Sequence, residues 1–176
     1  EIVKNAKKAE ANTYTEIILG LPGDTVEAHT QSLKSVVDAG FNVVRMYQMI
    51  LLPQTEMAEP ESRDKYQLQT KFRINPRSFG HYEFFDEPFY SVEFEEICIA
   101  DSTLSHEDYL NCRELNLSIE IFHNSGMFKE LHGFFQFLKI SWFDLIHQCY
   151  LSIRNHDHVL SSLYDRFREG SIIGLW

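Results

Sequence analysis

The sequence lacks the features that mark secreted and membrane proteins. Its three cysteines, Cys98, Cys112 and Cys149, are odd in number and far apart. This pattern argues against a disulfide framework and favours a reducing compartment, so we expect a cytoplasmic protein. No apolar stretch approaches the roughly 20 residues that a membrane-spanning helix needs, so we expect no membrane partner.

Basic residues are also scarce. The chain has 16 Lys and Arg against 26 Asp and Glu, with no basic run, so we expect no direct contact with nucleic acid. The sequence contains no internal repeat and no Ser-His-Asp or Cys-His pattern that identifies a nucleophile. Its 176 residues, 44% of them hydrophobic, suffice for one domain with a core, or for a domain with a small appendage.

The chain is organised around a short apolar run that ends in a glycine turn. The run Ile17-Ile18-Leu19 shows no alternation, which is typical of a strand buried on both faces in a parallel sheet. The turn Gly20-Leu21-Pro22-Gly23 follows, and its glycines allow a sharp bend and the close approach of a ligand to the main chain. Taken alone, this turn is more simply a strand-to-helix connection than a ligand site.

A helix and a second strand complete the unit. We expect a helix over 25–39, capped by Asp24 or Thr25 and ended by Gly40, and then a strand over 42–50. Strand, helix and strand in succession predict two parallel strands joined by a right-handed crossover. Ligands of such units bind at the carboxyl ends of the strands, where the glycine turn lies.

The second strand leaves one question of orientation open. Because side chains alternate along a strand, Arg45 and Tyr47 share one face, and Met46 and Gln48 share the other. The pattern does not decide which face is the interior. Arg45 is therefore either an outer residue under the flanking helix or a residue that points toward a ligand.

Two segments together resemble the radical S-adenosylmethionine (SAM) enzymes. The first is similar to the fifth-strand region of that family: Glu16-Ile17-Ile18-Leu19-Gly20-Leu21-Pro22-Gly23-Asp24-Thr25. The second is similar to the sixth strand, which leads into a Leu-Pro-Gly-Thr-like turn: Tyr47-Gln48-Met49-Ile50-Leu51-Leu52-Pro53-Gln54-Thr55-Glu56-Met57. Gln54 stands where the family usually has Gly. The resemblance covers residues 1–75 and is closest to the branch related to oxygen-independent coproporphyrinogen dehydrogenase, methylthiotransferases and cobalamin-binding radical SAM proteins.

The resemblance implies a fold and a set of cofactors. The implied fold is α/β, a partial (half) TIM-type barrel of parallel strands over residues 1–100, followed by an α-helical C-terminal extension over 101–176. The implied parent enzyme cleaves SAM reductively at a 4Fe–4S cluster, and part of the branch also uses cobalamin. The family positions that match cofactor contacts in this sequence are Ile18, Gly20, Leu21, Pro22, Gly23, Gln48, Met49 and Ile50.

The cluster motif of the family is missing from the chain. No Cys-x3-Cys-x2-Cys spacing exists, and residues 1–12 resemble a helix that a barrel strand should precede. We therefore expect a fragment whose partner is the missing N-terminal half of the same protein, acting on an unknown substrate. The fragment alone should be inactive, and no metal ligands are assigned in it.

The alternative is a non-catalytic α/β module that binds other proteins. A phosphate site at the helix start near Asp24 is a weaker hypothesis, because acidic residues there repel anions.

The rest of the chain predicts a charged helix, an aromatic extended segment and several helices. We expect a helix over 61–73, a break over 75–81, and extended chain over 82–85 and 89–99. Glu93, Glu95 and Glu96 favour a solvated strand face over a metal site. A capping box at Ser105 starts the helical region, and Asn124-Ser125-Gly126 interrupts it. Ser141 caps the next helix, and the last helix runs from about Val159 to Phe167.

The histidines of the helical region favour structural roles. His123, His132 and His147 lie among aromatic residues on predicted helices, a setting that favours packing or surface histidines over metal ligands. His156-Asp157-His158 has the density of a metal site, but it falls at a helix start, where polar residues cap. We expect no metal at either place.

Overall fold

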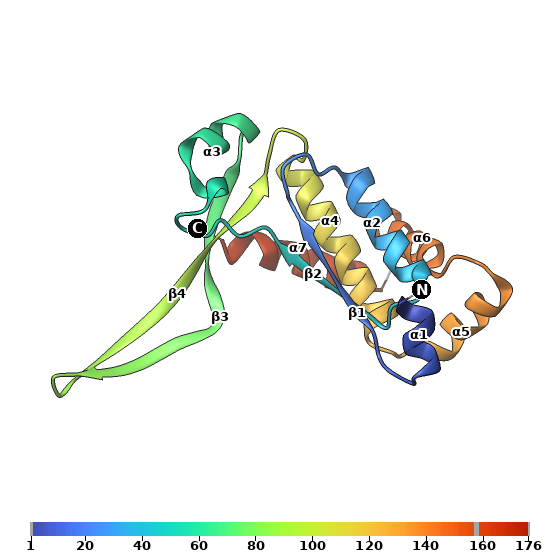
Figure 1. The fold of residues 1–176 in the computed structure, drawn as a ribbon. Helices are drawn as coiled ribbons and strands as arrows, with labels where there is room; N and C mark the ends of the chain where they lie inside the picture. Colours follow the sequence, from blue (N-terminus) through green and yellow to red (C-terminus); the bar gives the residue numbers. More distant parts are fainter. Residues whose placement is uncertain (1, 157–158, 176) are drawn as a thin grey trace.

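The computed structural model describes residues 2–156 and 159–175 (Figure 1). The chain forms, in order, α1 (Ile2–Lys8), β1 (Tyr14–Leu19), α2 (Val26–Ala39), β2 (Val43–Gln48), the 3-10 turn η1 (Glu56–Ala58), α3 (Pro60–Tyr66), β3 (Gln69–Phe84), β4 (Glu87–Ala100), α4 (His106–Ile119), the π-helical turn η2 (Glu120–Asn124), α5 (Lys129–Leu138), α6 (Trp142–Asn155) and α7 (Ser161–Ile173). No described helix is long and apolar enough to cross a lipid bilayer.

The predicted βαβ unit is present. β1 and β2 pair in parallel, with Ile18 opposite Tyr47, and α2 connects them. The Thr25 hydroxyl caps α2 by accepting a hydrogen bond from the Ala28 N–H at 3.1 Å. Gly40 ends the helix in the left-handed conformation, at φ 86°, which a residue without a Cβ adopts most easily. These local signals are short-range, and that is why the sequence predicts them well.

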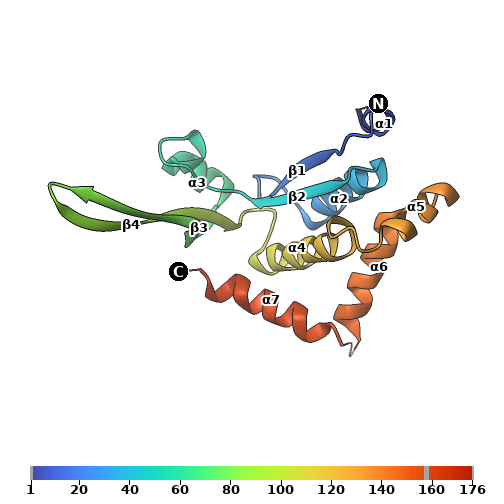
Figure 2. The same cartoon turned by 90° about the horizontal axis from the view of Figure 1, so that it is seen from below.

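One face of the parallel pair carries the main core. In Figure 2 the helices α2 and α4 lie on the same side of β1 and β2, with α7 beyond α4. The central cluster combines side chains from β2, α2, α4 and α6: Val44, Leu33, Val37, Leu115, Ile119, Trp142, Phe143 and Ile146. The core therefore includes residues on both sides of position 100. Burial of these apolar side chains is the main favourable term that holds the helices on the sheet.

No helix among the described residues covers the other face of the sheet, which is called the bare face below. Ile18 is 46% exposed and Tyr47 is 44% exposed, so the expectation that the first strand is buried on both faces is wrong for this structure. The physical reason is that all of the helices packed on the sheet lie on one side. Arg45 lies on this bare face, where its guanidinium stands 5.1 Å from the centre of the Tyr14 ring, so it does not pack under the helix.

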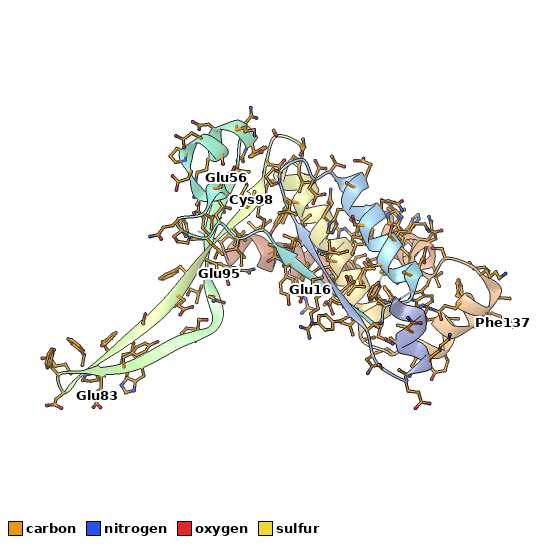
Figure 3. All side chains as sticks on the ribbon, viewed as in Figure 1. Glu16, Glu56, Glu83, Glu95, Cys98 and Phe137 are labelled. Carbon is orange, nitrogen blue, oxygen red and sulfur yellow. The ribbon has the colours of Figure 1, made fainter. Side chains whose placement is uncertain are left out.

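A long antiparallel hairpin projects from the carboxyl ends of the parallel strands (Figure 1). Met49 joins the two sheets, because its N–H donates to Leu19 O and its carbonyl accepts from Cys98 N–H, both at 2.9 Å. Ile50 then bridges Ile97 of β4 in antiparallel orientation. Figure 3 shows Cys98 at the base of the hairpin and Glu83 near its tip.

The helix expected over 61–73 forms only as far as Tyr66, and the break expected over 75–81 lies inside strand β3. α3 ends at Tyr66, where Gln67 adopts a left-handed conformation at φ 54°, and β3 begins at Gln69. The regular pairing of β3 with β4 is interrupted by a register shift between Ile74 and Phe79. The interrupted segment contains Pro76, whose main-chain nitrogen has no hydrogen to donate to a ladder. β4 supplies partners for β3 on both sides of this shift, and those of Gln69 to Arg73 lie more than twenty residues away, a pairing that local patterns do not reveal.

The helical region follows the predicted punctuation. Ser105 and Asp108 form the expected capping box, and Ser141 accepts from Asp144 N–H to start α6. The last helix begins at Ser161, two residues later than Val159, and α1 ends at Lys8 rather than near residue 12. Asp157 and His158, two of the three residues with metal-like density, lie outside the described residues.

A buried carboxylate ties α4 to the last two helices. Glu114 is 1% exposed and pairs with Arg154 of α6 and Arg168 of α7, each at 3.3 Å. The Ser118 and Tyr164 hydroxyls share a hydrogen bond of 2.7 Å one turn further along α4. Burial raises the pKa of Glu114, and the two guanidinium groups offset part of this cost of desolvation.

Burial suppresses the reactivity of the cysteines. Desolvation raises the pKa of Cys98 to about 11 and that of Cys112 to about 12. Cys149 is half-buried, and desolvation raises its pKa as well. Because the thiolate is the reactive form, the two fully buried thiols are poor nucleophiles and poor metal ligands.

Exchange of neighbouring residues on β1 tests the one-sided sheet. Leu19→Ala should lower the free energy of unfolding by about 2–5 kcal/mol, because Leu19 is completely buried. Ile18→Ala should cost about 1 kcal/mol or less, because that side chain is half exposed. Chemical denaturation of both variants measures the difference. Equal losses would mean that the bare face is covered in solution.

Thiol labelling tests the cysteine environments. At pH 8 under native conditions, a disulfide-exchange reagent should modify Cys149 first, with Cys98 and Cys112 reacting only when the chain unfolds. Mass spectrometry of timed samples gives the order of modification. Rapid native labelling of Cys98 would contradict the packing at the base of the hairpin.

Candidate ligand site at the carboxyl ends of the parallel strands

The glycine turn after β1 is a closed backbone loop. Gly20 and Gly23 both have left-handed φ values, 87° and 86°, which side chains with a Cβ adopt at a cost. The Asp24 carboxylate closes the loop by accepting from Gly20 N–H at 3.3 Å and from Thr25 N–H at 3.0 Å. The start of α2 therefore already holds a carboxylate, which argues against an anion site there.

The turn borders a shallow cavity of about 250 Å³. Four of the predicted cofactor-contact residues line it, namely Ile18, Leu21, Pro22 and Gly23, and the other walls come from β1 and the first turns of α2. All of the lining residues belong to β1, the turn or α2, so the cavity lies along the edge of β1 away from β2. Among the described residues, that edge of β1 pairs with no other strand.

The predicted residues of the second strand lie on the other side of the turn. The Gln48 side chain accepts a hydrogen bond from Arg73 of the hairpin at 2.6 Å, and Met49 is 5% exposed. Ile50 bridges β4 through the main-chain groups of its neighbours, since Leu51 N–H donates to Glu96 O and Met49 O accepts from Cys98. The N–H and C=O of Ile50 point to the opposite edge, toward β1, and have no hydrogen-bond partner among the described residues.

Gly20 lies between these two halves of the site. A Cβ built on Gly20 would come within 3.7 Å of Cys98 O, which is an ordinary contact, so the chain itself leaves room beside the turn. The structure thus brings all eight predicted residues to one end of the sheet. It divides them between a cavity on the outer edge of β1 and a free backbone edge at Ile50.

A buried histidine beneath the cavity was missed in the sequence. His29 lies in the second turn of α2 and is 1% exposed, and its Nε2 is 2.8 Å from the Asn116 side-chain oxygen. Burial lowers the pKa of His29, while the contact with Asn116 acts in the opposite direction. The ring is therefore neutral at pH 7 and donates from Nε2, since that oxygen only accepts. The partners are 87 positions apart in the sequence, so no local signal reveals the pair.

The loop before α4 braces the glycine turn and was also missed. The Thr103 hydroxyl donates to the Asp24 main-chain carbonyl at 2.7 Å. Asp101 holds this loop by accepting from the N–H groups of Thr103 at 2.6 Å and Leu104 at 2.9 Å. The brace fixes the turn against the C-terminal end of the hairpin.

Ion pairs at the base of the hairpin replace the expected solvated face. Arg73 pairs with Glu95 at 2.7 Å, and Arg63 contacts both carboxylate oxygens of Glu96 at 2.6 and 2.7 Å. The hydrogen bond from Arg63 lowers the pKa of Glu96. Only Glu93 remains on the exposed surface. No three His, Cys, Asp or Glu side chains among the described residues could hold a metal ion together.

Comparison with known proteins gives two distant relatives. No protein-family model matches the chain. A cobalamin-dependent radical SAM methyltransferase, TokK of Streptomyces tokunonensis, is 37% identical over 60 residues, which are 34% of this chain and 9% of that protein. A 2-(S-pantetheinyl)-carbapenam-3-carboxylate methyltransferase of Streptantibioticus cattleyicolor is 24% identical over 164 residues, which are 90% of this chain and 23% of that protein. The chain thus spans less than a quarter of the length of either relative, and the similarity points coarsely to radical SAM-related proteins.

Proposed function

We propose that this chain is part of a radical SAM enzyme of the methyltransferase kind, and that the carboxyl ends of β1 and β2 bind the adenosyl part of SAM. The observation that carries the proposal is the unpaired main chain of Ile50 beside the glycine turn. An N–H and a C=O on one strand edge match the donor and acceptor groups on the edge of adenine. The two distant relatives, both methyltransferases by name, support the same class.

Each half of the site has a separate task in this proposal. The half-exposed Ile18 side chain offers an apolar surface for the face of a base, and Ile50 offers hydrogen bonds to its edge. Gly20 keeps the space between them free of a side chain. The hydrogen bonds from Asp24 and Thr103 hold the turn in place before any ligand arrives, which reduces the entropic cost of binding.

The residues of this chain do not fit the iron–sulfur cluster that the family uses. Cys98 and Cys112 are buried with raised pKa values, and the cysteine spacing lacks the cluster motif. In the whole enzyme the cluster and cobalamin would supply the radical and methyl-group chemistry, held by other parts of the protein. The bare sheet face and the unpaired edge of β1 support this view, since parallel sheets are normally covered on both faces.

A second candidate function rests on the hairpin. Near its tip, Phe85 is 86% exposed, Tyr90 is 80% exposed and Phe79 is 68% exposed. Exposed aromatic side chains of this density are typical of surfaces that bind another protein, so a non-catalytic interaction module is the alternative. Failure of the full-length protein to bind SAM would favour this alternative.

The isolated chain should not cleave SAM. After reconstitution with iron, sulfide and a strong reductant, the 176-residue chain should release no 5′-deoxyadenosine, because it lacks the cluster ligands. Chromatographic assay of 5′-deoxyadenosine measures turnover. Turnover by the isolated chain would show that the cluster is held here, against our assignment.

Two matched glycine substitutions test the adenosyl site in the full-length protein. Gly20→Ala should weaken SAM binding at least tenfold, because the proposal places the adenosyl group beside Gly20, where an added Cβ meets only Cys98 O at 3.7 Å. Gly40→Ala is the control, since Gly40 has nearly the same φ, 86° against 87°, and lies at the far end of α2. Both changes should lower stability by roughly 1–2 kcal/mol through the same backbone strain. Calorimetric titration gives affinity and thermal unfolding gives stability; equal SAM affinities in the two variants would refute the site.

A further inference from the structure

The outer part of the β3–β4 hairpin, residues 78–94, carries an exposed aromatic surface. It projects away from the parallel strands and the helices, with Glu83 near its tip (Figure 3). Its Phe and Tyr side chains are each 49–86% exposed: Phe79, Tyr82, Phe84, Phe85, Phe89, Tyr90 and Phe94. Soluble proteins rarely expose so many neighbouring apolar side chains unless the surface binds something.

The same segment carries charge of one sign. Residues 78–94 contain no Lys or Arg, and the basic residues of β3 all precede Ser78. The acidic residues of the segment are Glu83, Asp86, Glu87 and Glu93. A second copy of this hairpin, or a membrane of anionic lipids, would therefore meet like charge. Charge complementarity favours a basic partner.

A notch of about 80 Å³ on the outer hairpin brings aromatic and acidic groups together. It is lined by Ser78, Phe79, Gly80, Tyr82, Ser91 and Glu93. Gly80 and Ser91 are opposite each other in the strand pairing, so no large side chain fills the space between the strands. A Cβ built on Gly80 would collide with the Tyr82 ring, so the glycine is needed for the ring to lie where it does.

The size of the notch favours one side chain over a whole small molecule. Sites for small molecules usually measure about 300–1,000 Å³, several times the volume of the notch. Tyr82 stacks with Phe89 at 5.3 Å, which holds the ring, and the Glu93 carboxylate accepts a hydrogen bond from Asn75 at 3.5 Å. A guanidinium group stacks on an aromatic ring and donates two parallel hydrogen bonds to a carboxylate, so arginine suits both walls.

We propose that the outer hairpin docks an extended, arginine-bearing segment of another protein, with one guanidinium group in the notch between Tyr82 and Glu93. β3 and β4 form a two-stranded sheet, and among the described residues no third strand pairs with its outer part. The main chain of an extended segment can therefore add to its edge. The proposal gives a partner class to the second candidate function. It does not rest on SAM binding, because the notch shares no residue with the candidate ligand site.

Three synthetic peptides test the proposal on the full-length protein. The first alternates arginine with threonine, so an extended backbone places every guanidinium group on one face. The second has lysine in place of arginine, and the third has citrulline, which keeps the shape without the charge. At roughly 0.15 M salt, charges more than about 8 Å apart are largely screened. The arginine peptide should then bind roughly tenfold more tightly than the citrulline peptide and several-fold more tightly than the lysine peptide. Fluorescence anisotropy of the labelled peptides measures the affinities.

Substitutions in the notch have matched controls at exposed positions far from it. Glu93→Gln and Tyr82→Leu should each weaken binding of the arginine peptide roughly fivefold. Glu130→Gln on α5 and Tyr14→Leu on β1 remove the same kinds of group and should leave binding unchanged. If Tyr82→Leu disturbs the hairpin, Glu93→Gln, which keeps the side-chain shape, decides alone.

Three results would overturn the proposal. They are equal affinity for the arginine and citrulline peptides, equal losses in the notch variants and their controls, and self-association through the hairpin without any preference for the arginine peptide. Glu93→Gln should leave SAM affinity unchanged, so this proposal and the adenosyl site fail separately.

Discussion

The main-chain hydrogen bonds of Met49 are the constraint on which the arrangement of this protein depends. One peptide group continues the parallel ladder by donating to Leu19, and the carbonyl of the same residue begins the antiparallel ladder by accepting from Cys98. A single residue thus ends one sheet and starts the other. The hairpin must leave the domain at the carboxyl ends of β1 and β2, where the glycine turn lies (Figure 1). The change of direction also leaves the N–H and C=O of Ile50 without a hydrogen-bond partner among the described residues.

The junction needs support, and nearby polar contacts supply it. Arg73 of β3 donates a hydrogen bond to Gln48 of β2, and Arg63 of α3 forms an ion pair with Glu96 of β4. Thr103 ties the loop after the hairpin back to the glycine turn. These contacts join segments that are distant in the sequence, so the candidate site is preorganised by residues outside the recognised motifs. Beyond this base, the contacts of the hairpin among the described residues lie within the hairpin itself, namely the strand ladder and stacked pairs such as Tyr82 with Phe89.

Buried polar atoms without a hydrogen-bond partner among the described residues occur at several places in the interior, including His29, Asp101 and Asn116. Glu114 shows the usual pattern, because its buried charge is paired with two arginines. His123 and Trp142 do not follow it, since each keeps a buried polar atom without a partner among the described residues. Natural sequences break the rule of satisfied polar groups mainly at functional sites.

The sequence by itself determined the elements whose signals are local. The apolar run before Gly20, the cap at Thr25, the stop at Gly40 and the capping box at Ser105 all lie where their residues predict, because capping and turn geometry depend on a few adjacent groups. The parallel pairing of β1 and β2 followed from the same punctuation. The division of the chain into two domains at residue 100 and the partial TIM-type barrel stay predictions.

Only the tertiary structure decided the features that depend on partners distant in the chain. Residues 69–73 carry a pattern that suits a helix, yet they form a strand because β4 supplies the hydrogen bonds. The apolar run predicts that Ile18 is a core residue, yet its side chain is half exposed because helices cover one face of the sheet. The pairing of His29 with Asn116, and the contact of His123 with the Phe41 carbonyl, come from chain folding over long separations, which local patterns do not encode.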